Sequence, residues 1–443
     1  MQHCDTLIVP RWCVPVEPAG EVLEGHAVAV TDGRIEAVLP IEQATASFQP
    51  SVLVERPDHV LIPGLINAHT HAAMTLFRGL ADDMPLEAWL HEGIWPAERR
   101  WVSAEMVRDG TELAIAEMIR GGITCFSDQY FYPEIVAEAA VDLSMRAVVA
   151  TPVVDFRTGW AENAAEYLQK AADLVHDPYA DHPLVTTAFA PHSTFALSDE
   201  SFADLRVLAD QLDVRVQIHL HETAAEVEIS LRDTGKRPYE RLVDAGLVNR
   251  SLLAVHAVHM DDAEIARFAE AGVSVAHCPN SNLKLASGIA PIAKYRSAGL
   301  NVAIGTDGAA SNNMLDMFSE MRTAALLAKA TANDASAVTA GEALHMATLG
   351  GAMALGLEST IGSIESGKWA DLACVNLRTL NSQPIYDVVS QLVYASRCDQ
   401  VADVWIAGRR HLENGQFVHI DTDGLLARAN EWRDRMLDTG EVQ

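Results

Sequence analysis

Histidine and aspartate residues recur in this sequence at positions where short apolar runs end. His69 and His71 form a His-x-His pair at the end of one run, and His219 and Asp307 end two others. Side chains two residues apart on a strand share a face, so the His-x-His pair could bind one metal ion through two imidazoles. A chance His-x-His is the alternative. Three imidazoles and one carboxylate suit Zn²⁺ first, with Fe²⁺ or Mn²⁺ as alternatives.

Glu222 lies three residues after His219, just beyond the same run. A carboxylate beside a metal-activated water can carry a proton to a substrate nitrogen or leaving group. The alternative is an N-cap or first-turn acid that stabilises the next helix, immediately before Thr223. His221 shares a face with His219, and we interpret it as a residue behind the metal ligands.

Eight apolar runs must position these residues. Near-continuous Val, Ile and Ala residues are typical of strands that are buried on both faces, as in parallel sheets. Most runs are followed by a helix-like segment, which predicts a closed (β/α)₈ barrel of the TIM type, with an open doubly wound sheet as the alternative. The runs cover residues 61–69, 123–128, 146–154, 184–192, 214–220, 252–259, 273–279 and 301–307.

The carboxyl ends of all strands in such a barrel emerge on one face, where active sites lie. A single histidine at a strand end is more often structural, but here nearly every run ends in or beside a histidine or aspartate. These residues are therefore expected to converge: His69, Asp128, Asp155, His192, His219, His256, His277 and Asp307.

Both ends of the chain differ from this middle part and are rich in β-forming residues and turns. Strands are expected over 5–9, 27–31 and 35–39, and again over 370–377 and 401–407, with turns at Asp32-Gly33 and Asn414-Gly415. Residues 424–437 have helical composition. We therefore predict a small β-sandwich made from residues 1–58 and 365–443, which also includes a terminal helix, and a barrel over 59–364.

The composition of the chain limits the classes of partner that it could bind. The chain has 443 residues, 49% of them hydrophobic, and a net charge of −29. Such an acidic surface repels phosphate groups, so neither nucleic acid nor an anionic membrane is expected as a partner, and a small-molecule ligand fits better. No apolar run approaches the roughly 18 residues of a membrane span, and the N-terminus lacks a signal-peptide pattern. Six scattered cysteines predict reduced thiols and a cytoplasmic location.

Several motifs together resemble the amidohydrolase superfamily, most closely its methylthioadenosine/S-adenosylhomocysteine deaminase branch, beside the triazine and guanine deaminases. They occur in the family's order and span almost the whole chain: LIPGLINAHTHAAMTLFRGLADD, IHLHET, HCPNSNLKL, GTDGAASNN and GSIESGKWADL. The resemblance implies a metal-dependent barrel with a β-sandwich built from both chain ends, and it points to a homo-oligomer.

The resemblance also implies roles for individual residues. Glu222 matches the proton shuttle, His256 the residue that stabilises the attacking hydroxide, and His192 a substrate-contacting histidine. Glu98 matches the carboxylate that holds the ribose hydroxyls. Relatives with two metals supply a bridging lysine, which the run 184–193 lacks, so one ion per subunit is expected. The implied zinc ligands are His69, His71, His219 and Asp307.

In the implied reaction, Asp307 helps to remove a proton from the metal-bound water, and the hydroxide attacks C6 of an adenine ring while Glu222 protonates N1. The amino group then leaves as ammonia, with its proton relayed by Glu222 or Asp307. Relatives that bind S-adenosylhomocysteine carry arginines where this chain has Thr151 and Trp160, with only Arg157 nearby. We therefore predict a preference for 5′-methylthioadenosine, its methylthio group against Trp160, over S-adenosylhomocysteine or adenosine. Loop packing is the alternative for Trp160. The rival functions are hydrolysis of another heterocycle, such as guanine or a triazine, and a non-catalytic barrel.

Overall fold

The computed structural model describes residues 1–438. The chain divides into two compact units. Unit 1 comprises Met1–Asn67, Glu117–Cys125 and Asp316–Ile420, and unit 2 comprises Ala68–Ala116, Phe126–Leu315 and the segment from Asp421 onward. The domain boundaries expected from the sequence remain predictions, and residues 439–443 of the predicted C-terminal part lie outside the described residues.

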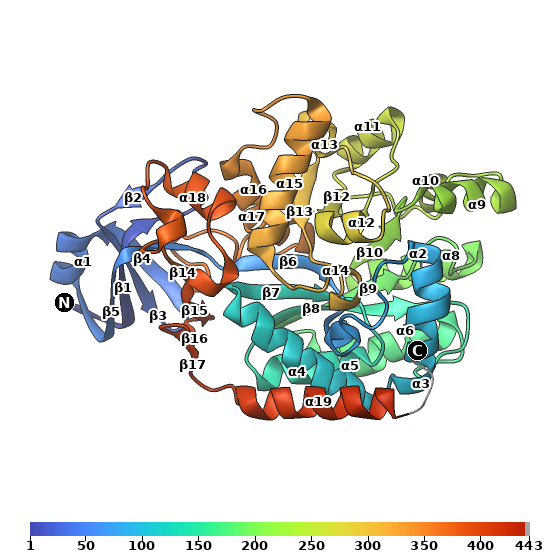
Figure 1. Ribbon diagram of the computed structural model, residues 1–443, viewed down its shortest axis with the longest axis horizontal. Helices are drawn as coiled ribbons and strands as arrows, with labels where there is room; N and C mark the ends of the chain where they lie inside the picture. Colours follow the sequence, from blue (N-terminus) through green and yellow to red (C-terminus); the bar gives the residue numbers. More distant parts are fainter. Residues whose placement is uncertain (439–443) are drawn as a thin grey trace. The chain divides into compact units, whose positions relative to one another are not determined.

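The first sheet has eight strands in sequential order and curves into a barrel (Figure 1). The neighbouring strands from β8 to β13 pair in parallel. Just after the last strand, the N–H of Asp307 donates to the carbonyl of His69 over 3.0 Å, next to the first strand. The predicted barrel is confirmed and the open sheet was wrong. The strands are β6 (Leu65–Thr70), β7 (Ile123–Asp128), β8 (Arg146–Val153), β9 (Val185–Pro191), β10 (Arg215–Leu220), β11 (Leu252–His256), β12 (Ser274–His277) and β13 (Asn301–Ile304).

These strands follow the predicted apolar runs closely, because strands covered on both faces leave no polar side to interrupt the pattern. Every residue of β7 and β8 is buried. One run was read wrongly: residues 61–69 divide at Gly64, between the end of one sheet and the start of the other. A Cβ on Gly64 would lie 2.0 Å from Oγ1 of Thr124, so only glycine allows this close approach.

Helices follow most of the barrel strands along the chain. None of the helices within residues 1–438 is both long and apolar enough to cross a membrane. The main ones are α3 (Trp95–Trp101), α4 (Ala104–Arg120), α5 (Pro133–Asp142), α6 (Ala164–Lys170), α8 (Asp199–Leu212), α9 (Ala224–Thr234), α10 (Pro238–Asp244), α11 (Asp262–Ala271), α12 (Pro279–Lys284), α13 (Ile292–Ser297), α15 (Met317–Ala332), α16 (Ala340–Met346), α17 (Leu349–Leu355) and α18 (Val388–Tyr394).

The C-terminal helix α19 (Thr422–Leu437) packs along α4, as Figure 1 shows, and confirms the helix expected over 424–437. The indole N–H of Trp432 donates to Asp109 over 2.9 Å, and Arg428 forms ion pairs with Asp109 and Glu112. The apolar ring of Trp432 is 5% exposed, so burial as well as charge fastens this helix.

The second sheet contains nine strands and unites the two ends of the chain, as predicted. Strand β14 runs antiparallel to β5, with Leu372 opposite Pro63 and Asn376 opposite His59. The sheet order is β17-β16-β15-β14-β5-β1-β3-β4, with β2 on β1. The strands are β1 (Gln2–Cys13), β2 (Leu23–Glu24), β3 (His26–Thr31), β4 (Arg34–Pro40), β5 (Phe48–Pro63), β14 (Leu372–Asn376), β15 (Val401–Ile406), β16 (Arg409–Glu413) and β17 (Gln416–Phe417).

Each face of this second sheet carries a hydrophobic cluster. Along β3, Val28 and Val30 belong to one hydrophobic cluster, whereas Ala27 and Ala29 belong to the cluster on the other face. This alternation follows from the period of two along a strand. The 16-residue strand β5 was missed because its polar and proline residues hide the alternation. The turns at Asp32-Gly33 and Asn414-Gly415 are confirmed, with all four residues at positive φ.

Candidate active site

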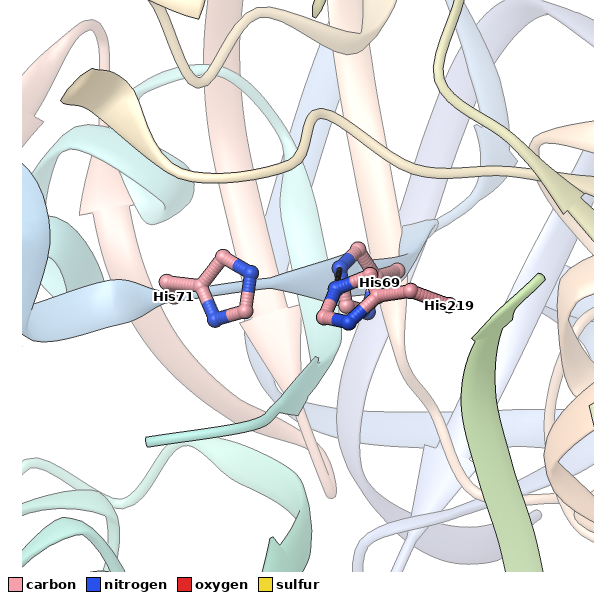
Figure 2. Close-up of side chains that lie close together, drawn as sticks. All are labelled: His69, His71 and His219. Atoms are coloured by element: carbon pink, nitrogen blue, oxygen red, sulfur yellow. Dashed lines mark hydrogen bonds between the residues drawn. The ribbon is translucent and has the colours of Figure 1, made fainter. Parts of the chain in front are cut away.

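Three histidine rings from β6, the residue just beyond it and β10 point toward one another (Figure 2). One ring nitrogen from each of His69, His71 and His219 lies within 4.8 Å of the other two. The Nε2 atoms of His69 and His219 are 3.2 Å apart. The sequence separation of 150 residues is bridged because β6 and β10 present their carboxyl ends at the same face of the barrel.

Backbone carbonyl groups orient two of these rings. His71 Nδ1 lies 2.6 Å from the carbonyl oxygen of Gln129, and His219 Nδ1 lies 2.6 Å from that of His192. A carbonyl oxygen only accepts, so each Nδ1 carries a hydrogen and each Nε2 faces the cluster. This arrangement is typical of metal-ligating histidines.

Asp307 completes the cluster. Its Oδ1 lies 3.5 Å from Nε2 of His69 and 3.2 Å from Nε2 of His71, while its Oδ2 accepts hydrogen bonds from Ser281 and Ser311. Burial raises the pKa of Asp307, but the facing histidines and their hydrogen bonds lower it further, so the net pKa lies well below its usual value. The carboxylate is therefore ionised and held in one orientation.

His256 and Glu222 lie beside this cluster. His256 Nδ1 donates to Oδ1 of Asn282 over 2.8 Å, and its Nε2 lies 3.8 Å from the Glu222 carboxylate. Ser287 donates to the other oxygen of Glu222 over 3.0 Å. Burial raises the pKa of Glu222, which helps the carboxyl group to hold a proton. Thr223, and not Glu222, caps α9, so the alternative interpretation of Glu222 as the N-cap was wrong.

The donor set fits a divalent cation of the zinc type. Burial lowers the pKa of His69 to about 4 and that of His219 well below its usual value, so both rings are neutral and their lone pairs are available. Burial also lowers the pKa of His71, but the hydrogen bond to Asp307, the negative charges of Asp307 and Asp128 and the hydrogen bond to Gln129 together raise it to about 9. A cation would replace the proton that His71 and Asp307 share, which is how nitrogen and oxygen ligands exchange protons for a metal.

Glu98 and His192 lie close to the cluster. Glu98 accepts a hydrogen bond from the Tyr130 hydroxyl over 2.8 Å, and the Tyr130 ring lies 6.3 Å from that of His71. Burial raises the pKa of Glu98 to about 7. The ring of His192 lies 4.9 Å from that of His219. Both side chains are therefore near enough to contact a small molecule bound at the cluster.

Trp160 was expected either beside a methylthio group or in loop packing. Its indole N–H donates to the carboxylate of Glu134 over 3.0 Å, its ring packs against Tyr167, and it is 5% exposed. This placement agrees with loop packing, and a contact of Trp160 with the methylthio group stays a prediction. Arg157 forms an ion pair with Glu162 and is mostly exposed.

The other expected residues have separate contacts. His221 accepts a hydrogen bond from the N–H of Tyr239, which connects it to α10 and not to the cluster. Asp155 accepts from Ser198 and Ser201, at the start of α8. Among the described residues His277 has no hydrogen-bond partner for either ring nitrogen. Asp128 accepts from the N–H of Ala72, directly after His71.

The supporting residues were missed by sequence reasoning. Ser281, Asn282 and Ser287 hold Asp307, His256 and Glu222 in place, and Tyr130 does so for Glu98. The first two lie within the motif HCPNSNLKL, whose unusual density of polar residues was the available signal.

Comparisons with known proteins agree with this geometry. A model of the amidohydrolase family matches residues 60–411, and the chain belongs to that family. It is 44% identical over 425 residues to a 5-methylthioadenosine/S-adenosylhomocysteine deaminase of Teredinibacter turnerae, covering 96% of each chain.

Two solved structures are also similar to this chain. An adenosine deaminase from Xanthomonas campestris with bound zinc is 52% identical to this chain. The two structures superpose with a TM-score of 0.98, and the alignment covers 99% of this chain and 100% of that one. The zinc complex of an atrazine chlorohydrolase from Arthrobacter aurescens is 26% identical, with a TM-score of 0.90 over 96% and 99% of the two chains.

Proposed function

We propose that this protein is a zinc-dependent hydrolase that removes the 6-amino group of an adenosine-type nucleoside and releases ammonia. The observation that carries the proposal is the convergence of three imidazoles and one carboxylate, from β6, β10 and the turns that follow β6 and β13, beside a mostly buried glutamate. The names of the relatives, which include deaminases of adenosine and of its 5′-substituted forms, support the substrate class.

The proposed ligands are His69, His71, His219 and Asp307, which would hold one ion. When bound, the ion supplies a water molecule that is acidic enough to react as a nucleophile near neutral pH. All other steps belong to side chains of this protein.

Glu222 would donate its proton to N1 of the purine, because its carboxyl group is buried, faces the cluster and is held by Ser287. His256 presents Nε2 to the same space, since Asn282 occupies its Nδ1, and would stabilise the reacting oxygen. Glu98 and His192 would bind the nucleoside, with Glu98 on the ribose hydroxyls.

Within this class we propose a preference for 5′-methylthioadenosine over S-adenosylhomocysteine. The larger nucleoside carries a carboxylate that is best bound by a bidentate guanidinium. Arg157 is the sole arginine between residues 151 and 162, and it is exposed and paired with Glu162.

One experiment tests the whole proposal. Ammonia release from zinc-loaded protein would be measured for adenosine, 5′-methylthioadenosine, S-adenosylhomocysteine, 5′-deoxyadenosine, guanine and a chlorotriazine, with zinc content determined on the same sample. We expect about one zinc per subunit and the highest kcat/KM for 5′-methylthioadenosine. Turnover of only guanine or the triazine would contradict the proposal, and so would the absence of any turnover. Equal kcat/KM values for 5′-methylthioadenosine and S-adenosylhomocysteine would contradict the proposed preference between them.

The proposed setting is the cytoplasm, with a homo-oligomer as the assembly and no nucleic-acid partner. The six cysteines, which form no disulfide among the described residues, support the compartment, and the net charge of −29 supports the lack of nucleic-acid binding. Light scattering of the purified protein tests the assembly, and a monomer would contradict it.

A further inference from the structure

The short segment 279–287 forms hydrogen bonds with three side chains of the candidate active site. Ser281 donates to Asp307, Asn282 accepts from His256, and Ser287 donates to Glu222. These residues belong to α12 or the turn directly after it. Lys284, the last residue of α12, takes no part in these contacts.

Lys284 is the centre of a polar cluster that joins three loops of unit 2. Its ammonium group donates to Oδ1 of Asp82 over 2.6 Å, to the carbonyl of Ala310 over 3.0 Å and to the side chain of Asn313. Asn313 also donates to the other oxygen of Asp82 over 3.1 Å. Arg78 donates to the backbone carbonyl of Asn313. The loops after β6, β12 and β13 are thus tied at one point.

Such a cluster differs from an ordinary surface ion pair, whose contribution is small. The side chain of Lys284 is 20% exposed, and all three donor positions of its ammonium group have an acceptor. The hydrogen bond from Lys284 also lowers the pKa of Asp82.

Asp82 is connected to Glu98 by close packing. Its neighbour Ala81 lies so near η2 (Trp89–Ile94) that a Cβ on Gly93 would be 2.6 Å from the Cβ of Ala81. The helix η2 continues directly into α3, which carries Glu98. A displacement of the Asp82 loop would therefore move the helix that presents Glu98.

We propose that Lys284 is a positioning residue that fixes the Asp82 loop and, through it, the helix that carries Glu98. The inference rests on the proposed function, in which Glu98 binds the ribose. It means that α12 holds the reacting side chains with Ser281 and Asn282 and the nucleoside-binding side chain with Lys284.

Hydrogen exchange of the zinc-loaded protein without nucleoside tests the structural half of this proposal. Lys284→Met and Asp82→Asn should each raise amide exchange in residues 79–101 by about tenfold or more, since a local opening would lose its main restraint. The matched control is Lys294→Met, which breaks a Lys–Asp pair of the same 2.6 Å length on α13 with a mostly exposed lysine. It should leave that segment unchanged. Unchanged exchange in both test variants would overturn the proposal, whether or not the protein deaminates nucleosides.

Kinetics with the best nucleoside tests the functional half. Both variants should raise KM by about tenfold with kcat within about twofold, because they weaken ribose binding that is equal in the ground state and transition state. The double variant should be no worse than either single one, since the two residues act through one contact. Faster exchange with an unchanged KM would show that the cluster does not position Glu98. An inactive wild-type enzyme would instead reject the proposed function, while the exchange result would still stand.

Discussion

Glu222 lies at the start of a helix but has no part in capping it. Thr223 caps α9, so the Glu222 carboxylate is left to face His256 and Ser287. Single atoms around the cluster have similarly specific effects. Two carbonyl oxygens place the Nδ1 hydrogens of His71 and His219, and two serine hydroxyls fix the orientation of the Asp307 carboxylate. Changes at this scale should therefore alter chemistry or metal binding while the barrel stays folded.

Glu222→Gln should lower kcat by about a hundredfold to ten-thousandfold, which is the usual range for loss of a general acid or base. The amide keeps the shape and the hydrogen bond from Ser287 but cannot deliver a proton. Zinc content should stay at the wild-type value. Ammonia release and metal analysis measure the two quantities, with Glu228→Gln on the exposed side of α9 as the control. Near-native turnover in Glu222→Gln would exclude the proton-transfer role.

His71→Ala should lower the zinc content of the purified protein, because it removes one of three converging imidazoles. We expect added zinc to raise the melting temperature of the wild-type protein but not that of the variant, since the stabilisation depends on ligand affinity. Calorimetry with and without added zinc measures this. His3→Ala, an exposed histidine of β1, serves as the control. Full zinc content in His71→Ala would contradict the assignment.

At the scale of elements, α19 illustrates how a helix predicted from composition obtains its stability from packing. Trp432→Ala should destabilise the protein by about 3–5 kcal/mol, because it removes a buried indole and its hydrogen bond to Asp109. Leu426→Ala on the same helix, at 56% exposure, should change stability by less than about 0.5 kcal/mol. Urea unfolding of both variants tests this, and equal midpoints would mean that α19 is not fastened through Trp432.

The elements also show what the sequence could predict. The barrel strands were found because burial on both faces makes their residue pattern continuous, as in β7 and β8. His69, His219 and Asp307 could be identified because they lie where these continuous apolar runs end. Strand β5 and the contacts of Trp160 were not predictable, because polar residues interrupt the first and the second depends on partners such as Tyr167 in another element. Ser281 and Asn282 needed the spatial relation between α12 and the strand ends.

At the scale of the whole chain, the sheet of unit 1 contains a buried ionic contact between distant parts of the sequence. Asp403 on β15 is fully buried and accepts two hydrogen bonds from Arg56 on β5, at 2.5 and 2.8 Å, and another from Arg410. Burial raises the pKa of Asp403, but the two guanidinium groups lower it more, so its net pKa is below the usual value.

The lowered pKa of Asp403 has a defined effect on acid stability. Its contribution is fully present above the unfolded-state pKa of about 4 and is lost as the pH falls through the lower folded-state pKa. Asp403→Asn should destabilise the protein by about 3–5 kcal/mol at pH 7, since two arginines lose a buried partner. The difference from wild type should shrink below about pH 4.

Chemical unfolding from pH 7 down to pH 3 measures this dependence. Asp58→Asn, whose partner Arg378 is mostly exposed, is the control and should change stability by less than about 1 kcal/mol. A difference between Asp403→Asn and wild type that did not vary with pH would contradict the lowered pKa.

The pairing of β5 with β14 also has a consequence for biosynthesis. Residue 63 leaves the ribosome long before residue 372, its partner across the sheet. At about 5–20 residues per second, the nascent chain would carry that edge of β5 without its neighbour for roughly 15 to 60 seconds. An uncovered edge can recruit strands from other chains, so translation speed and chaperone access during this interval should influence how much of the protein is recovered in native form.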